Sequence, residues 1–379
     1  IGSFVADATS QSFSLTAGTA ATSKSTQVNA MLLRDVTDVV GIWTGAVDGN
    51  WDATTANWSG GPVFSKYGSL PKGLVLKFGD QDGSGNTVTN STITMSASGF
   101  NNAGSLSFSA GTVNYTLLTA GGSLGIGGTA TLSKSGAATL TLGGTHTFTG
   151  AVNVFGGTLL TASAGALPAV PLTVASGARL DLNGFSQRIG LLTNNGTVTN
   201  TGAPATLTLT NGFAGTGPVY SGSLSIGLAN NSSTSLYLTT LPNPSGALMN
   251  TGTGSGTAQS FASTDNTLPG SVVLNTAIGS NITGLVQDSL TSSFVVNATN
   301  SSFNKPVEVR RGALVIANQN SAVSNPLGTG TITIGTGSAN AALIHAGRFA
   351  SASTGSTGAG HTLSNAVYVG GTGTNVISA

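Results

Sequence analysis

A short acidic turn is the best candidate for chemistry in this sequence. Asp80, Asp82 and Asn86 lie in the segment Asp-Gln-Asp-Gly-Ser-Gly-Asn, where oxygen-bearing side chains alternate with small residues. Calcium-binding loops place oxygen ligands at alternate positions and need glycine for a sharp turn. The late bidentate acid of such a loop is missing here, because its position is occupied by Ser91. Two interpretations stay open, a calcium site at these three residues or, as we favour, a solvated Asp/Gly turn.

The histidines show no metal-binding pattern. His146, His345 and His361 lie far apart among Thr, Ala and Gly, and none forms a His-x-x-x-His pair. We expect them to be strand or turn residues without a role in a site.

Carboxyl groups are too sparse for the usual sugar chemistry. Glycoside hydrolysis needs two carboxyls about 5 to 9.5 Å apart. After the acidic turn the acids are few: Asp181, Asp265, Asp288 and Glu308. Asp181 could cluster with Arg179 and Arg188 on one coil, although a surface ion pair explains them equally well. Without cysteine there is no thiol catalysis or thiolate metal site. We therefore expect no enzyme activity, and no cofactor other than the calcium considered above.

Charge is scarce along the whole chain. The 379 residues include 12 basic and 11 acidic side chains, and none lies between Ile189 and Thr264. Hydrophobic residues make up 39% of the chain, so there is enough apolar surface to form a core. Val, Leu and Ile interleave with Thr and Ser, which favours strands over helices. A net charge of +1 gives no basic patch for nucleic acid, and no apolar run is long enough to span a bilayer.

All three tryptophans fall in one short segment. Trp43, Trp51 and Trp58 fall within 16 residues, and the turns beside them are supplied by Asp-Gly-Asn at 48–50 and Ser-Gly-Gly-Pro at 59–62. Large rings so closely spaced favour a cap that covers the open end of a sheet stack. The alternative is an aromatic platform on which a glycan stacks.

These motifs resemble the autotransporter-associated β-strand repeat family. The similarity begins with Trp-Thr-Gly, Asn-Trp-Asp and Ala-Asn-Trp at the three tryptophans. It continues with Thr-Leu-Thr-Leu at 139–142, Thr-Phe-Thr-Gly at 147–150 and Gly-Gly-Thr-Leu at 156–159. Residues 41–165 follow the family pattern closely and 166–379 only loosely. One departure is Ala151, where the family usually has glycine, and another is the absence of a C-terminal membrane-barrel pattern. The resemblance implies a bacterial surface or passenger-type β-helix.

An internal repeat supports a stacked fold. Residues 147–154 match 302–309, 157–159 match 312–314, and 172–174 match 332–334. Short strands separated by Gly, Asn and Ser turns suit a parallel β-helix of roughly 20–25 residues per coil. A β-sandwich for 200–300 is the alternative, because Asn-Gly pairs also form hairpins.

We therefore predict an all-β chain in three parts. Residues 1–40 form an N-terminal extension, with a short helix over 26–39, that a neighbouring copy could receive as an exchanged strand. Residues 41–100 form the Trp-rich cap. Residues 101–379 form the β-helical repeat region, with weak repeat copies near 139–180 and 300–340, and we expect this region to continue beyond 379.

The expected function is structural. We predict a secreted or cell-surface protein that acts as a subunit of a self-assembling bacterial filament or stalk, with copies of itself as partners. The alternative is an autotransporter-like adhesin passenger that binds a glycan or a host or neighbour surface. Neither nucleic-acid binding nor membrane insertion of this segment is expected.

Overall fold

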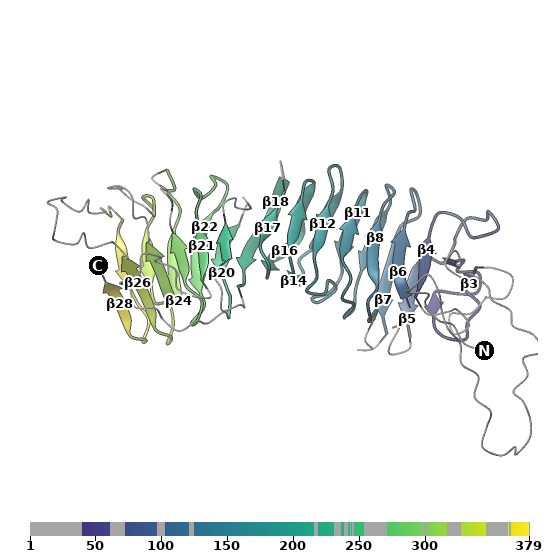
Figure 1. Cartoon of the computed structure of the whole chain (residues 1–379), viewed down its shortest axis with the longest axis horizontal. Helices are drawn as coiled ribbons and strands as arrows, with labels where there is room; N and C mark the ends of the chain where they lie inside the picture. The colour runs from purple at the N-terminus through teal and green to yellow at the C-terminus, as the bar shows by residue number, and fades with distance from the viewer. Residues whose placement is uncertain are drawn as a thin grey trace, which may run out of the picture.

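The chain folds as a β-solenoid. The computed structural model describes residues 40–60, 73–96, 103–120, 125–215, 219–230, 236–238, 242, 244, 246–253, 271–296, 298, 300, 302–316, 327–345, 363 and 365–378. Figure 1 shows the strands stacked one behind another along a single long axis. In these ranges there is no helix, and every strand pairing except β1–β3 is parallel. The predicted extension 1–40, apart from Val40, and the predicted helix 26–39 lie outside the described residues.

One face of the N-terminal half is a nine-stranded sheet. Its strands, in spatial order, are β17 (Phe213–Ala214), β15 (Leu192–Asn194), β12 (Leu172–Val174), β10 (Val152–Val154), β8 (Thr131–Lys134), β6 (Ala103–Phe108), β4 (Leu74–Phe78), β1 (Val40–Trp43) and β3 (Trp58–Ser59). The register pairs Val152 with Leu172 and Leu172 with Leu192. One coil therefore takes 20 residues here, within the predicted coil length of roughly 20–25 residues.

A second face runs beside the first through the N-terminal half. Its strands are β2 (Asn50–Trp51), β5 (Thr92–Met95), β7 (Tyr115–Thr119), β9 (Thr139–Leu142), β11 (Thr158–Thr161), β13 (Arg179–Asp181) and the first part of β16 (Thr197–Leu209). Alternate side chains point inward, because successive residues of a strand face opposite sides of a sheet. In β9, for example, Leu140 and Leu142 are buried while Thr139 and Thr141 are partly exposed.

A third face begins at β14 and continues to the C-terminal end. It contains β14 (Gln187–Ile189), the second parts of β16 and β18 (Val219–Leu228), β20 (Ala247–Asn250), β22 (Gly284–Asp288), the first part of β24 (Val307–Ile316), β25 (Ile332–Ile334) and β27 (Val367–Val369). The opposing strands of the C-terminal half are β19 (Leu236–Leu238), β21 (Val272–Leu274), β23 (Phe294–Val296), the second part of β24, β26 (Ala341–His345) and β28 (Asn375–Ser378).

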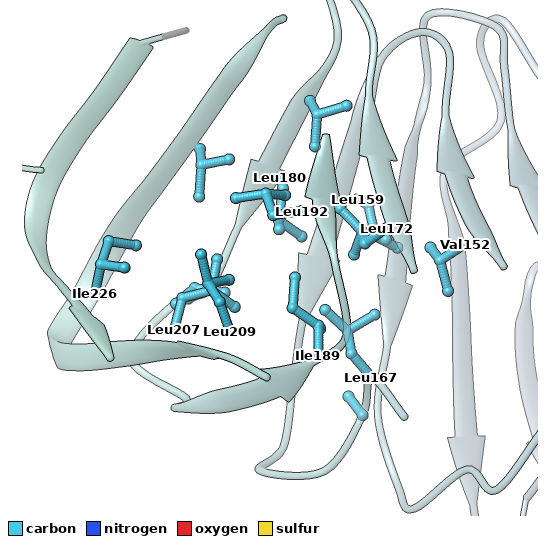
Figure 2. Close-up of a cluster of buried hydrophobic side chains, with 14 of the residues drawn as sticks. Val152, Leu159, Leu167, Leu172, Leu180, Ile189, Leu192, Leu207, Leu209 and Ile226 are labelled. Atoms are coloured by element: carbon cyan, nitrogen blue, oxygen red, sulfur yellow. The ribbon is translucent and has the colours of Figure 1, made fainter. Parts of the chain in front are cut away.

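The core is a set of side-chain columns that follow the strand register. Leu106, Leu132, Val152, Leu172 and Leu192 form one such column, and all five are buried. Figure 2 shows the leucine, valine and isoleucine side chains from the surrounding faces meeting in the interior. Each fully buried aliphatic side chain contributes about 2 kcal/mol by leaving water.

The β-helix prediction is confirmed, and the sandwich alternative for 200–300 is not adopted. The named strands in that region, β16 to β23, pair in parallel with strands of adjacent coils and form no hairpins with one another. The two predicted repeat copies share two local features, although their first strands, β10 and the first part of β24, belong to different sheets. Gly157 directly precedes β11, and Gly312 lies within β24. Both have a positive φ, 62° and 69°, a left-handed conformation that favours glycine. Phe148 and Phe303 are both buried at the matching turns.

Candidate functional site

The three tryptophans form one buried cluster with Phe78. The ring centroids of Trp43 and Trp58 lie 5.2 Å apart, and those of Trp51 and Trp58 lie 5.1 Å apart, both edge to face. Phe78 lies 5.6 Å from Trp58 and stacks at 4.2 Å on Phe108 of the next coil. This geometry is the favoured one for aromatic pairs and confirms the Trp-rich cap.

The cluster does not provide the alternative glycan platform. A sugar that stacks on an indole needs an exposed ring face, whereas Trp43 and Trp51 are 0% exposed and Trp58 is 2% exposed. The close spacing in sequence brings the rings inward, because each tryptophan lies at an inward position of β1, β2 or β3.

Asn57 organises the turns around the tryptophans. Its fully buried side chain accepts hydrogen bonds from the backbone N–H groups of Val47 and Asp48 at 2.9 and 3.2 Å. Its amide donates to Asp48 Oδ1 at 2.7 Å and to the Asn50 carbonyl at 2.9 Å. The sequence indicated Asn57 only as part of the Ala-Asn-Trp motif. The structure shows that its hydrogen bonds fix the turn between Trp43 and Trp51 against the segment that precedes Trp58.

Asp80 is an acceptor for the backbone of the next coil. Its carboxylate accepts from the N–H groups of Gly111, Thr112 and Val113 at 2.8 to 2.9 Å, and from the Thr112 hydroxyl. Hydrogen bonds from Val113, Gly111 and Thr112 hold the pKa of Asp80 well below its ordinary value. The carboxylate is therefore ionised and ties two coils together.

Asp82 and Asn86 belong to a different local structure. Asp82 accepts from the backbone N–H groups of Ser84 and Asn86 at 2.8 and 2.9 Å, and from the Asn86 amide at 3.1 Å. Hydrogen bonds from Asn86 come first among those that lower the pKa of Asp82. The three predicted calcium ligands are thus close in sequence, but Asp80 and Asp82 are engaged by separate sets of donors. This matches a hydrogen-bonded turn, and calcium binding here stays an untested hypothesis.

The described part of the chain holds no cluster of three or more His, Asp or Glu residues that could bind a metal ion. Within the same residues no helix is long and apolar enough to cross a membrane.

His146 is a buried structural residue. Its Nδ1 accepts from the backbone N–H of Ile126 at 3.1 Å, and its side chain is almost fully buried. Burial lowers the pKa of His146 to about 4, against a smaller upward effect of the Gly143 carbonyl. The ring is therefore neutral at pH 7. His345 ends β26, whose last side chains are not described, and His361 lies outside the described residues.

Three of the four acids considered for catalysis form ion pairs. Asp181 binds Arg179 at 2.8 Å, while Arg188 is exposed and has no described bond to either. Burial by itself raises the pKa of Asp181, but hydrogen bonds from Asn183, Thr201 and Arg179 lower it overall. The other two acids pair with arginines: Glu308 with Arg310 at 2.8 Å and Asp288 with Arg311 at 2.6 Å. Asp265 lies outside the described residues.

Two buried polar features were not evident from the sequence. Lys134 points into the core, where its Nζ donates to the carbonyls of Ser135, Gly136 and Gly156. Burial lowers the pKa of Lys134. In the C-terminal half, Gln287 accepts from the Asn250 amide at 2.9 Å, and both side chains are at most 1% exposed. Lys134 and Gln287 each occupy a core-column position that is aliphatic in a neighbouring coil, as at Val154 and Val309. Their buried positions follow from the register between coils, which the sequence does not give.

Comparisons of the chain with family models, with curated proteins and with solved structures found no match. The fold therefore defines the class, a β-solenoid repeat protein. The resemblance to the autotransporter-associated repeat rests on the sequence motifs alone.

Proposed function

We propose that this protein is an extracellular structural protein, a subunit of a bacterial surface filament or stalk that assembles from copies of itself. The observation that carries the proposal is the contrast between the interior of the solenoid and its outer surface. Largely apolar columns run along the interior, whereas the outward register positions are mostly uncharged and polar, as in Ser107, Ser133, Asn153, Thr173 and Thr193.

The architecture suits a mechanical role. In a parallel solenoid every strand pairs with strands of neighbouring coils, so tension along the axis is shared by many backbone hydrogen bonds. The nearly uncharged outer surface offers little electrostatic repulsion between copies. The acidic groups in the described ranges accept hydrogen bonds in turns or form ion pairs, which supports a structural role over a catalytic one.

The adhesin alternative has lost its best candidate contact, because the three tryptophans are buried. It would need recognition by loops, and no described group of residues favours this.

Electron microscopy of the purified chain by negative staining at neutral pH tests the proposal. We expect regular fibres with a repeat of several nanometres, and we expect a chain that lacks residues 1–39 to form none. Isolated single rods at high protein concentration would contradict the filament. Retention on a polysaccharide matrix without fibres would favour the adhesin.

A further inference from the structure

Three Asn-Gly pairs lie at corners of the solenoid: Asn183-Gly184, Asn195-Gly196 and Asn211-Gly212. Each begins within two residues of the end of a strand, β13, β15 or β16. Asparagine before glycine is open to spontaneous deamidation, because glycine has no side chain that hinders the approach of its backbone nitrogen to the carboxamide. The structure treats the three pairs differently.

The chemistry of this reaction sets the requirement on the structure. The glycine nitrogen attacks Cγ of asparagine, and the new C–N bond closes a succinimide ring. The bond from Cγ to the side-chain nitrogen breaks, and the proton of the glycine N–H leaves with that nitrogen as ammonia. Water then opens the ring at either carbonyl and gives aspartate or isoaspartate. A hydrogen bond that holds the glycine N–H or the carboxamide in place therefore opposes ring closure.

Two of the pairs are held by such hydrogen bonds. The N–H of Gly184 donates to Asn200 Oδ1 at 2.7 Å, and the Asn183 carboxamide donates to the Thr161 carbonyl at 3.3 Å. The N–H of Gly196 donates to the buried side chain of Asn194 at 3.0 Å. In both pairs the nitrogen has to give up a hydrogen bond before it can attack.

The third pair is not held in this way. Asn211 is exposed, and its backbone N–H donates to the Gly190 carbonyl at 3.4 Å. The Gly212 carbonyl accepts from the N–H of Leu192 at 3.2 Å. Neither the N–H of Gly212 nor the carboxamide of Asn211 has a hydrogen-bond partner among the described residues. A backbone N–H without a partner is unfavourable in itself, and ring closure here breaks no hydrogen bond.

We infer that Asn211 is a site of spontaneous deamidation and reacts faster than the other two Asn-Gly pairs. The product, aspartate or isoaspartate, lies at the corner between β16 and β17. No Asp, Glu, Lys or Arg occurs between Ile189 and Thr264, so the new carboxylate becomes the one charged side chain of that stretch. The inference goes beyond the proposed function and does not depend on it.

The sequence supplies a matched comparison within the chain. Asn183 and Asn211 are both followed by Gly-Phe, so their intrinsic reactivity is similar and a difference between them has to come from the fold. The experiment incubates the full chain in mild base, because ring closure needs the amide proton to leave. Mass spectrometry of chymotryptic peptides then locates each carboxamide that has become an acid. The same chain in denaturant gives the reference rates.

We expect the folded chain to convert Asn211 roughly tenfold faster than Asn183, the factor that a hydrogen bond of ordinary strength supplies. In denaturant the two rates should be similar. Equal rates in the folded chain, a faster reaction at Asn183 or Asn195, or an Asn211 that stays unconverted would each overturn the inference.

Charge provides a second readout. Isoelectric focusing of the aged chain should show an acidic species that Asn211→Gln removes, because glutamine closes its ring far more slowly. Asn195→Gln is the control and should leave this species unchanged. An acidic species that forms as fast in Asn211→Gln would refute the assignment.

Asn200→Ala tests the physical reason. It removes the acceptor of the Gly184 N–H, so we expect faster conversion of Asn183 and no change at Asn211. Asn200 also donates to the carbonyls of Ala203 and Ser223, and hydrogen exchange of β16 checks that the fold persists. An unchanged rate at Asn183 would contradict the protective role of the hydrogen bond. If this variant does not fold, the comparison of Asn183 with Asn211 in the unmodified chain still decides the inference.

Discussion

The N-terminal coils, β1 to β11, and the C-terminal coils, β20 to β24, build the same fold with different chemistry. The N-terminal columns begin with stacked aromatic rings, and their turns are held by ionised carboxylates such as Asp52 and Asp80. The C-terminal columns are mainly aliphatic, and their buried polar contacts come from the neutral amides of Asn250, Gln287 and Asn300. A solenoid needs an acceptor wherever a turn leaves backbone donors buried, but the acceptor can be charged or neutral. The difference predicts that sensitivity to acid is concentrated in the N-terminal coils.

The largest effect is expected from Phe78→Ala. Phe78 contacts all three tryptophans and Phe108, so its removal leaves a cavity and breaks several aromatic pairs. Loss of a buried phenylalanine costs about 3–5 kcal/mol, and each aromatic pair adds about 1 kcal/mol. Phe294→Ala in the aliphatic C-terminal column is the matched comparison.

Hydrogen exchange resolves these two effects, because a linear array unfolds by region rather than in one step. We expect amides of β1, β4 and β6 to exchange faster in Phe78→Ala, by more than amides of β21 to β24 do in Phe294→Ala. Lys77→Ala, on the outward face of β4, should leave exchange unchanged. Equal losses in the two phenylalanine variants would contradict the special role of the aromatic cap.

The next effect is the pH dependence from His146. Its pKa is lowered from 6.5 to about 4 in the folded protein, so the unfolded chain binds the proton more readily. Its contribution is therefore fully present above about pH 6.5 and is lost as the pH falls toward 4. The largest loss is about 3 kcal/mol.

His146→Asn can keep an acceptor for the Ile126 N–H but cannot titrate in this range. We expect the protection factors of amides near β8 to β11, which correct for the intrinsic pH dependence of exchange, to fall between pH 6.5 and 4 in the unmodified protein and to fall less in His146→Asn. Amides of β20 to β24 should not show this difference. A difference of the same size there would mean that acid acts on the whole rod.

Gln287→Ala should have an intermediate effect on the C-terminal coils. The substitution removes one of the acceptors of the Asn250 amide and the donor to the Ser289 carbonyl. An unsatisfied buried group costs about 2 kcal/mol. The protection factors of amides in β20 and β22 should fall, by the same amount at every pH between 4 and 7. The exposed Gln81→Ala is the control, and additive effects of Asn250→Ala and Gln287→Ala would argue against a coupled pair.

The sequence predicted what is local and periodic. Thr-Leu-Thr-Leu at 139–142 alternates inward and outward as its pattern requires, and the closely spaced tryptophans do form the cap. What it did not reveal depends on register. Asp80 reaches donors more than 30 residues ahead, and Gln287 meets Asn250 across 37 residues. Such contacts are set by the length of each coil, which turns and insertions change from one coil to the next.

A smaller effect is expected from Asp80→Asn. The amide keeps one acceptor oxygen but loses the charge that three backbone donors and one hydroxyl stabilise, at a cost of about 1 kcal/mol. Because the folded pKa is lowered, the contribution of Asp80 is present above its ordinary value of 3.8 and is lost as the pH falls below it. Exchange of β7 should therefore differ between the two proteins at pH 6 and converge in stronger acid. Asp82→Asn, confined to its own turn, should leave β7 unchanged.

The smallest effect is the one expected from calcium. The oxygens of Asp80 already accept four hydrogen bonds from Gly111, Thr112 and Val113, and Asp82 is engaged by Ser84 and Asn86. A calcium ion would have to take these oxygens from donors that keep adjacent coils and the turn in place. We expect millimolar calcium to give no heat of binding and no shift in melting temperature. A saturable shift that Asp80→Asn and Asp82→Asn both abolish would instead show that the turn reorganises around the ion, and that the carboxylates of the N-terminal coils are ligands as well as ties.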